Sequence, residues 1–113
     1  MDGAKPRERE RRVLLRVPFG AHVELTVGGR VRAAHAIDLS AAGLGVRLAP
    51  PPEWGDAVEA EFHLPGFAVP LAISARVAWR DAREGRLGLA FDALEPAVVE
   101  LLESCVAGRF DAG

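Results

Sequence analysis

Cysteine is almost absent from this 113-residue sequence, because Cys105 is the only one. A single thiol can form neither an intramolecular disulfide nor a zinc site built from cysteines, so both of these ways of stabilising a small domain are excluded. Cys105 falls within an apolar pattern of helical spacing, which predicts a buried structural thiol.

Long apolar runs are also lacking. No stretch approaches the roughly 18 consecutive apolar residues that a membrane-spanning helix requires. The N-terminus is charged and has none of the apolar centre that a secretory signal contains. We therefore expect a cytoplasmic protein that does not insert into membranes.

An excess of positive charge is missing as well. The formal net charge is −2 at pH 7, whereas dedicated duplex-DNA binders are strongly basic, so we expect no duplex nucleic acid as a partner. The charge is nevertheless uneven, since residues 1–16 hold more basic than acidic side chains and the remainder is acidic. This distribution favours a local anion site on an acidic body.

Signatures of catalysis do not occur either. The histidines His22, His35 and His63 are scattered along the chain. There is no glycine-rich phosphate loop and no pair of motifs with metal-ligand spacing. We expect a protein that is not an enzyme and that carries no metal or other cofactor.

The length and an apolar content of 50% allow one modest core. Residues 1–10 are charged and nearly free of apolar side chains, so we expect a flexible N-terminal tail. The folded domain is expected to span residues 11–108, and residues 109–113 are expected to form a C-terminal tail.

Period-two alternation of apolar and polar residues predicts a mostly β fold. Gly28 and Gly29 predict a tight hairpin turn between the first two strands, because both can adopt positive φ. In the longest run the apolar residues share one parity, and Trp79 is the last of them. The predicted strands cover residues 22–27, 30–37, 44–48, 58–64, 68–79 and 87–91.

The apolar spacing changes to that of one helical face near the C-terminus, over residues 94–106. Asp92 and Glu95 resemble a capping box, Pro96 suits the first turn, and Gly108 suits the end of the helix. Six short antiparallel strands followed by one helix predict a small β-barrel or closed sandwich on which the helix packs.

Residues 38–43 bring together a carboxylate in Asp38, a hydroxyl in Ser40 and the glycine Gly43. These residue types are common in turns, since Asp and Ser side chains bond nearby backbone N–H groups and glycine adopts unusual φ values. Ordinary turn chemistry is therefore one interpretation of the segment.

The second polar segment is arginine-rich. Arg12 and Arg16 are four residues apart, so they fall on one side of either a helix or a strand. A solvated charged segment is one interpretation, although the apolar residues between the arginines should pack and hold them in place. Together the two segments can bind a guanine nucleotide, because a carboxylate accepts hydrogen bonds from guanine N–H groups while arginines bind its acceptor edge and phosphates.

These residues resemble the two-part signature of PilZ domains, the bacterial receptors for the second messenger cyclic di-GMP. The first part is the spacing Arg12-x-x-x-Arg16 and the second is Asp38-x-Ser40-x-x-Gly43. The sequences Val77-Ala78-Trp79 and Gly88-Leu89-Ala90-Phe91 are similar to the late strand pair of the same family. The resemblance covers residues 11–107.

The resemblance implies a six-stranded antiparallel β-barrel of the split-barrel type with one C-terminal α-helix, and cyclic di-GMP as the ligand. Arg12 and Arg16 would contact phosphates and guanine edges, and the residues that would face a guanine are Asp38, Ser40 and Gly43. In similar domains an arginine directly before the first motif favours an intercalated dimer of cyclic di-GMP, and Arg11 holds that place. Trp79 has two interpretations, as a ligand-stacking residue or as a core residue.

A PilZ-like receptor would transmit the second-messenger level to a protein partner, which the sequence does not identify. We expect ligand binding to order the N-terminal arginine segment, defined as residues 11–16, against the barrel. The alternative is a PilZ-like interaction adaptor that binds no nucleotide, since some members of the family have lost the two motifs.

Overall fold

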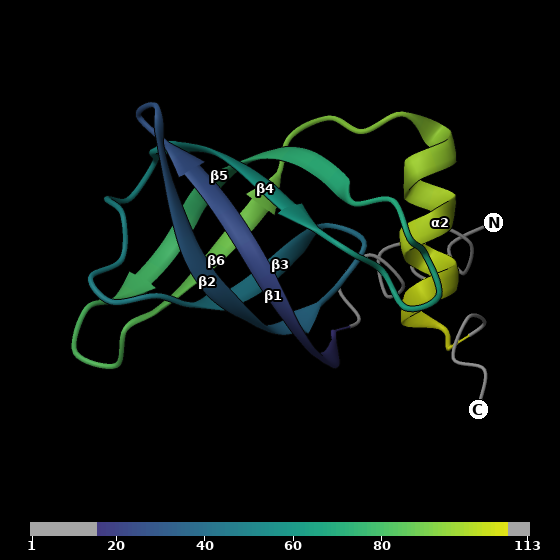
Figure 1. The fold of residues 1–113 in the computed structure, drawn as a ribbon, viewed down its shortest axis with the longest axis horizontal. Coiled ribbons are helices and arrows are strands. Elements are labelled where there is room, and N and C mark those ends of the chain that lie inside the picture. The colour runs from purple at the N-terminus through teal and green to yellow at the C-terminus, as the bar shows by residue number, and fades with distance from the viewer. Residues whose placement is uncertain (1–15, 109–113) are drawn as a thin grey trace, which may run out of the picture.

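The computed structural model describes residues 16–108, so the tails predicted for residues 1–10 and 109–113 lie outside it. Within this range the elements are β1 (Val17–Val27), β2 (Arg30–Leu39), β3 (Gly43–Arg47), β4 (Ala57–Phe62), β5 (Leu71–Asp81), β6 (Arg86–Phe91) and α2 (Pro96–Val106). All neighbouring strands are antiparallel, and the sheet closes into a barrel in the order β1-β2-β3-β6-β5-β4 (Figure 1). The predicted fold, a six-stranded antiparallel barrel with a C-terminal helix, is confirmed.

The β1–β2 hairpin forms at the predicted turn, where Gly28 and Gly29 adopt φ values of 58° and 81°. Its first strand begins at Val17, earlier than the apolar alternation predicted, and runs through Pro18. A register shift between Pro18 and Ala21 accounts for this extension, since proline is tolerated in strands next to a bulge.

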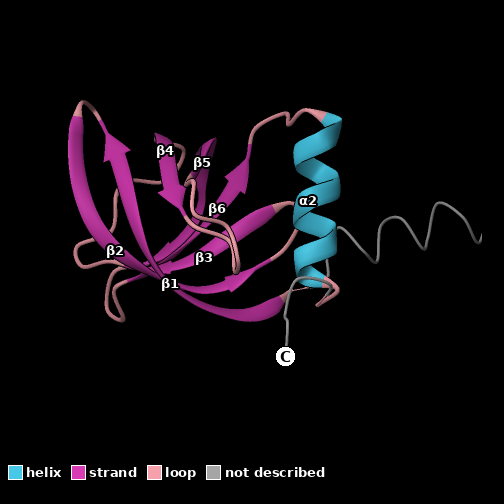
Figure 2. Cartoon of the chain, turned by 45° about the vertical axis from the view of Figure 1, so that its right-hand side comes forward, coloured by secondary structure: helices cyan, strands magenta, loops and turns pink. Residues whose placement is uncertain are grey.

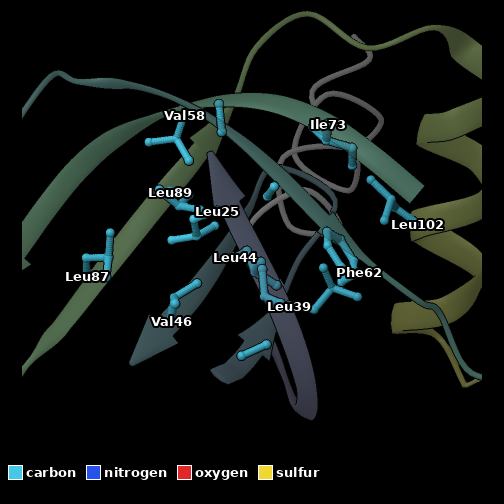
Figure 3. Packing of buried hydrophobic residues seen from close by; sticks show 14 of the residues in the cluster. Leu25, Leu39, Leu44, Val46, Val58, Phe62, Ile73, Leu87, Leu89 and Leu102 are labelled. Carbon is cyan, nitrogen blue, oxygen red and sulfur yellow. The ribbon is translucent and has the colours of Figure 1, made fainter. Parts of the chain in front are cut away.

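Apolar side chains from all six strands fill the barrel interior (Figure 3). Leu25, Leu44 and Leu87 are completely buried. Phe62 is also enclosed and makes an edge-to-face contact with Phe19, with ring centroids 5.9 Å apart. The alternation in the sequence therefore decides which residues form the core, because successive side chains of a strand point to opposite faces.

The helix α2 lies at one end of the barrel (Figure 1, Figure 2). Leu102 is completely buried there, and Val106 is nearly so. Cys105 packs against the core but is only partly buried, so the predicted buried thiol is partly enclosed.

The ends of α2 agree only in part with the predicted signals. Pro96 occupies the first turn and Gly108 follows the helix with φ 80°, both as predicted. The capping box is wrong, because Glu95 is the N-cap and makes no side-chain capping hydrogen bond. Asp92 instead lies near Arg76, with 3.8 Å between Oδ1 and the guanidinium Nε.

Candidate functional site

The turn between β2 and β3 is built around Ser40, whose side chain is buried. Its Oγ accepts hydrogen bonds from the backbone N–H groups of Ala42 at 3.1 Å and Gly43 at 3.0 Å. Its own N–H donates to the carbonyl oxygen of Gly43 at 2.9 Å. The hydroxyl therefore satisfies the turn's backbone donors, as the interpretation of ordinary turn chemistry expects.

Gly43 is required by a close approach of two strands. A Cβ at this position would collide with the backbone oxygen of Leu89 on β6 and lie 3.3 Å from its carbonyl carbon. It would also lie 3.5 Å from Nη2 of Arg16. The expected reason, an unusual φ, is wrong, since Gly43 is not among the glycines with positive φ.

Arg16 and Asp38 join the two predicted parts of the site. Nη1 of Arg16 donates a hydrogen bond of 2.7 Å to Oδ1 of Asp38, across 22 residues of sequence. Both side chains are partly exposed, at 44% and 31%. Arg11 and Arg12 lie outside the described residues, so their expected contacts stay predictions.

Two β-bulges turn site residues toward the outside of the barrel. Register shifts lie between Ala36 and Asp38 on β2 and between Val77 and Trp79 on β5. An extra residue reverses the inward and outward alternation of a strand. Ala36 and Val77 consequently face the core, whereas Asp38 and Trp79 face outward.

The core interpretation of Trp79 is therefore wrong. Parity along the predicted run of residues 68–79 places this side chain inside, but 45% of the residue is exposed. Its ring lies over Gly88 of β6, where a Cβ would approach within 2.6 Å of Cε2 and 2.7 Å of Cδ1.

Four residues form one rung across the outer face of β2, β3, β6 and β5. Asp38 pairs with Gly45, Gly45 with Gly88, and Gly88 with Trp79. The Asp38 carboxylate lies against Gly45, whose Cβ would be 2.9 Å from its Cγ. A carboxylate and an indole thus flank two residues without side chains, and this rung is called the glycine rung below.

Gly45 and Gly88 are structural parts of this site that the sequence analysis missed. Each occupies an outward position between two buried apolar residues of its strand, and an isolated glycine in a strand is a signal for a close approach of another group. The rung as a whole presents a hydrogen-bond acceptor and an aromatic face, which cover the two buried glycines. This combination suits a planar ligand with N–H donors on its edge.

A family model described as PilZ domain matches residues 6–108 of this sequence. The chain belongs to the PilZ domain family. The predicted family is thereby confirmed, and PilZ domains are typically receptors for cyclic di-GMP and act as receptor or adaptor domains rather than as enzymes. No curated protein matches the sequence.

Several solved structures share the PilZ fold of this chain. The Bacillus subtilis inhibitor of motility, MotI/DgrA, has a TM-score of 0.66 and 18% identity, over 87% of this chain and 51% of its own. The PilZ domain with c-di-GMP of YcgR from Escherichia coli has a TM-score of 0.65 and 17% identity, over 85% and 88%. The PilZ domain of CeSA from a cellulose-synthesising bacterium has a TM-score of 0.60 and 21% identity, over 85% and 94%. This chain spans about half of the MotI/DgrA chain.

The PilZ domain offers no metal centre over residues 16–108, where no three His, Cys, Asp or Glu side chains are grouped to hold an ion. In the same part of the chain, no helix has the length and apolarity needed to cross a membrane.

Proposed function

We propose that this PilZ domain is a cyclic di-GMP receptor that binds the nucleotide between its arginine segment and the turn at residues 38–43. The hydrogen bond from Arg16 to Asp38 carries the proposal, since it brings the two halves of the family's signature into contact. The glycine rung supports it, because its two glycines let the Asp38 carboxylate and the Trp79 indole lie close against the outer face of the barrel.

The chemistry of the pair suits a guanine nucleotide. Asp38 Oδ2 accepts no hydrogen bond from residues 16–108, so this oxygen is available to the N–H donors on a guanine edge. Arg16 uses Nη1 for Asp38 and keeps further N–H donors for a phosphate or for the acceptor edge of a guanine. Trp79 supplies an aromatic face on which a second ring can stack.

Ser40 and Gly43 have indirect parts in this proposal. The hydroxyl of Ser40 fixes the turn, and Gly43 lets β3 approach the backbone of Leu89 on β6 beside the guanidinium of Arg16. Arg12 would add a second guanidinium, and Arg11 would favour an intercalated dimer of the ligand.

Signalling is proposed to follow from ordering of the arginine segment on the bound nucleotide. Arg16 already contacts the barrel, and residues 11–15 directly precede it in the chain. A ligand that binds these arginines would change the surface presented to a protein partner in the cytoplasm. The domain acts by this change of surface and performs no catalysis.

Isothermal titration calorimetry with cyclic di-GMP tests the proposal. The wild-type protein should bind, and Arg16→Ala should bind about tenfold to a hundredfold more weakly, which is the scale of a lost charge-assisted contact. Arg30→Ala is the matched control, since Arg30 lies at the other end of the β1–β2 hairpin and should not change the affinity.

Absence of binding heat at tens of micromolar protein and ligand would reject the receptor function. The nucleotide-free adaptor predicts in addition an unchanged melting temperature, whereas a receptor must be stabilised by its ligand. Equal affinities of wild type and Arg16→Ala would place the binding site elsewhere.

A further inference from the structure

Next to the glycine rung lies a second rung that is rich in charge. On β3 and β6, Arg47 and Arg86 are direct cross-strand partners, as Gly45 and Gly88 are. Arg47 follows Gly45 by two residues, and Arg86 precedes Gly88 by two residues. Both arginines therefore share the outer face with the glycines and lie roughly 7 Å further along the strands. The flanking strands contribute His35 and Asp81 to the same rung.

Among the described residues, Arg47 and Arg86 are directly opposed arginines whose side chains have no polar partner, whereas Arg30 and Arg83, which also have none, lie in or next to turns. Within the range 16–108 neither side chain of the opposed pair has a hydrogen bond or an ion pair. The arginines that do have polar partners are Arg16, Arg32, Arg76 and Arg80. The guanidinium Nε of Arg86 is moreover buried and has no hydrogen-bond partner among the described residues.

The neighbouring carboxylate of Asp81 does not neutralise this pair. Its Oδ1 accepts hydrogen bonds from the backbone N–H groups of Arg83 at 3.0 Å and Glu84 at 3.2 Å, which fixes it within the β5–β6 turn. Although Asp81 and Arg86 are cross-strand partners, they form no ion pair.

Two facing arginines without an acid are unfavourable in the free protein. Like charges directly opposite each other destabilise a strand pair, and a buried N–H group without an acceptor adds the free energy of its lost hydration. A bound anion removes the repulsion between the two arginines, and two adjacent guanidinium groups match the geometry of a phosphate.

We propose that Arg47 and Arg86 form a phosphate subsite for cyclic di-GMP, adjoining the glycine rung. This inference rests on the proposed receptor function and extends its site. A base that stacks on the Trp79 indole, beside the Asp38 carboxylate, has Arg16 on one side, near Gly43, and the Arg47–Arg86 pair on the other. The phosphate belongs either to the nucleotide held by Asp38 or to a second nucleotide stacked on it.

Calorimetric titration of cyclic di-GMP into Arg47→Gln, Arg86→Gln and the double variant tests the subsite. The double variant should bind on the order of tenfold more weakly or more, with a smaller loss of affinity between low and high salt than the wild type shows. The matched control is Arg83→Gln, an exposed arginine in the β5–β6 turn, which should bind as the wild type does.

The stoichiometry identifies the origin of the phosphate. If the double variant keeps the wild-type number of nucleotides per chain at reduced affinity, the phosphate belongs to the nucleotide at Asp38. If the number falls from two to one, it belongs to the second nucleotide. In either case the melting temperature of the free double variant should not fall, because removing a like-charge pair relieves repulsion.

Three results would overturn the subsite, and they are distinguishable. A double variant with wild-type affinity, stoichiometry and salt dependence would refute the subsite and leave the receptor function intact. A wild-type protein that binds no cyclic di-GMP would refute both. A double variant whose free form melts well below the wild type would assign Arg47 and Arg86 a structural role instead.

Discussion

Replacing Gly45 by alanine separates the function of the glycine rung from its contribution to stability. The added Cβ would lie 2.9 Å from Cγ and 3.1 Å from Oδ2 of Asp38, and closer still to Oδ1. Carbon atoms that are not bonded prefer separations of about 3.5–4.0 Å, so the carboxylate must retreat by roughly 1 Å. Oδ1 accepts the hydrogen bond of 2.7 Å from Arg16, and a shift of that size stretches the bond beyond its useful range.

The loss of stability in Gly45→Ala should be small. Arg16 and Asp38 are 44% and 31% exposed, and an ion pair that exposed contributes at most about 1 kcal/mol. The group that must move is the end of a side chain, which can rotate without disturbing the sheet. We expect the free energy of unfolding to fall by about 1 kcal/mol. The affinity for cyclic di-GMP should fall by about tenfold to a hundredfold, because the displaced carboxylate loses its charge-assisted contacts with the ligand.

Gly43→Ala is the comparison, because its Cβ would meet backbone instead of a side chain. The carbonyl of Leu89 cannot retreat without separating β3 from β6, so we expect the free energy of unfolding to fall by about 2–3 kcal/mol. Urea denaturation measures both stabilities, and calorimetry measures both affinities. The reasoning is refuted if Gly45→Ala binds cyclic di-GMP like the wild type, or if it loses as much stability as Gly43→Ala.

Two further predictions concern the turn and the ligand-facing ring. Ser40→Ala leaves the N–H groups of Ala42 and Gly43 without their acceptor, so urea denaturation should show a loss of about 2 kcal/mol, whereas the exposed Ser74→Ala should change stability by less than about 0.5 kcal/mol. In a Trp54→Phe background, fluorescence reports Trp79 alone, and cyclic di-GMP should change its emission. Emission that stays constant while calorimetry shows binding would exclude Trp79 from the site.

Much of the fold could be predicted from the sequence, because apolar periodicity has a direct structural cause. The alternation at Val23 and Leu25 follows from the two faces of a strand, and both residues are buried as the pattern requires. The turn at Gly28 and Gly29 was equally clear, since both glycines adopt positive φ. The family signature then placed Asp38 beside the arginine segment, and the Arg16–Asp38 contact agrees with it.

The bulges could not be predicted, and they determine how the site is built. One extra residue in β5 reverses the orientation of Trp79, although the sequence continues its apolar parity without interruption. A bulge depends on the pairing with the neighbouring strand, which local periodicity does not contain. The contacts of Gly45 with Asp38 and of Gly88 with Trp79 could not be predicted for the same reason. Which residues meet across neighbouring strands depends on the register of the strands and not on the spacing along one strand.

The capping box failed for a different reason. Asp92 and Glu95 have the required spacing, but Asp92 follows β6 directly, and its backbone N–H donates to the carbonyl oxygen of Ser74. This hydrogen bond holds Asp92 against the barrel, and the helix begins only at Pro96. Sequence spacing alone could not show that the sheet already engages this residue.

Amide NMR during a titration with cyclic di-GMP tests the central claim most directly, because it reports where the nucleotide lies. The proposed site predicts shifts for the amides of Gly43, Gly45 and Gly88, while Gly28 and Gly29 at the hairpin tip stay unchanged. Unchanged spectra at saturating nucleotide, or shifts confined to the β1–β4 face around Glu24 and Glu61, would contradict the account.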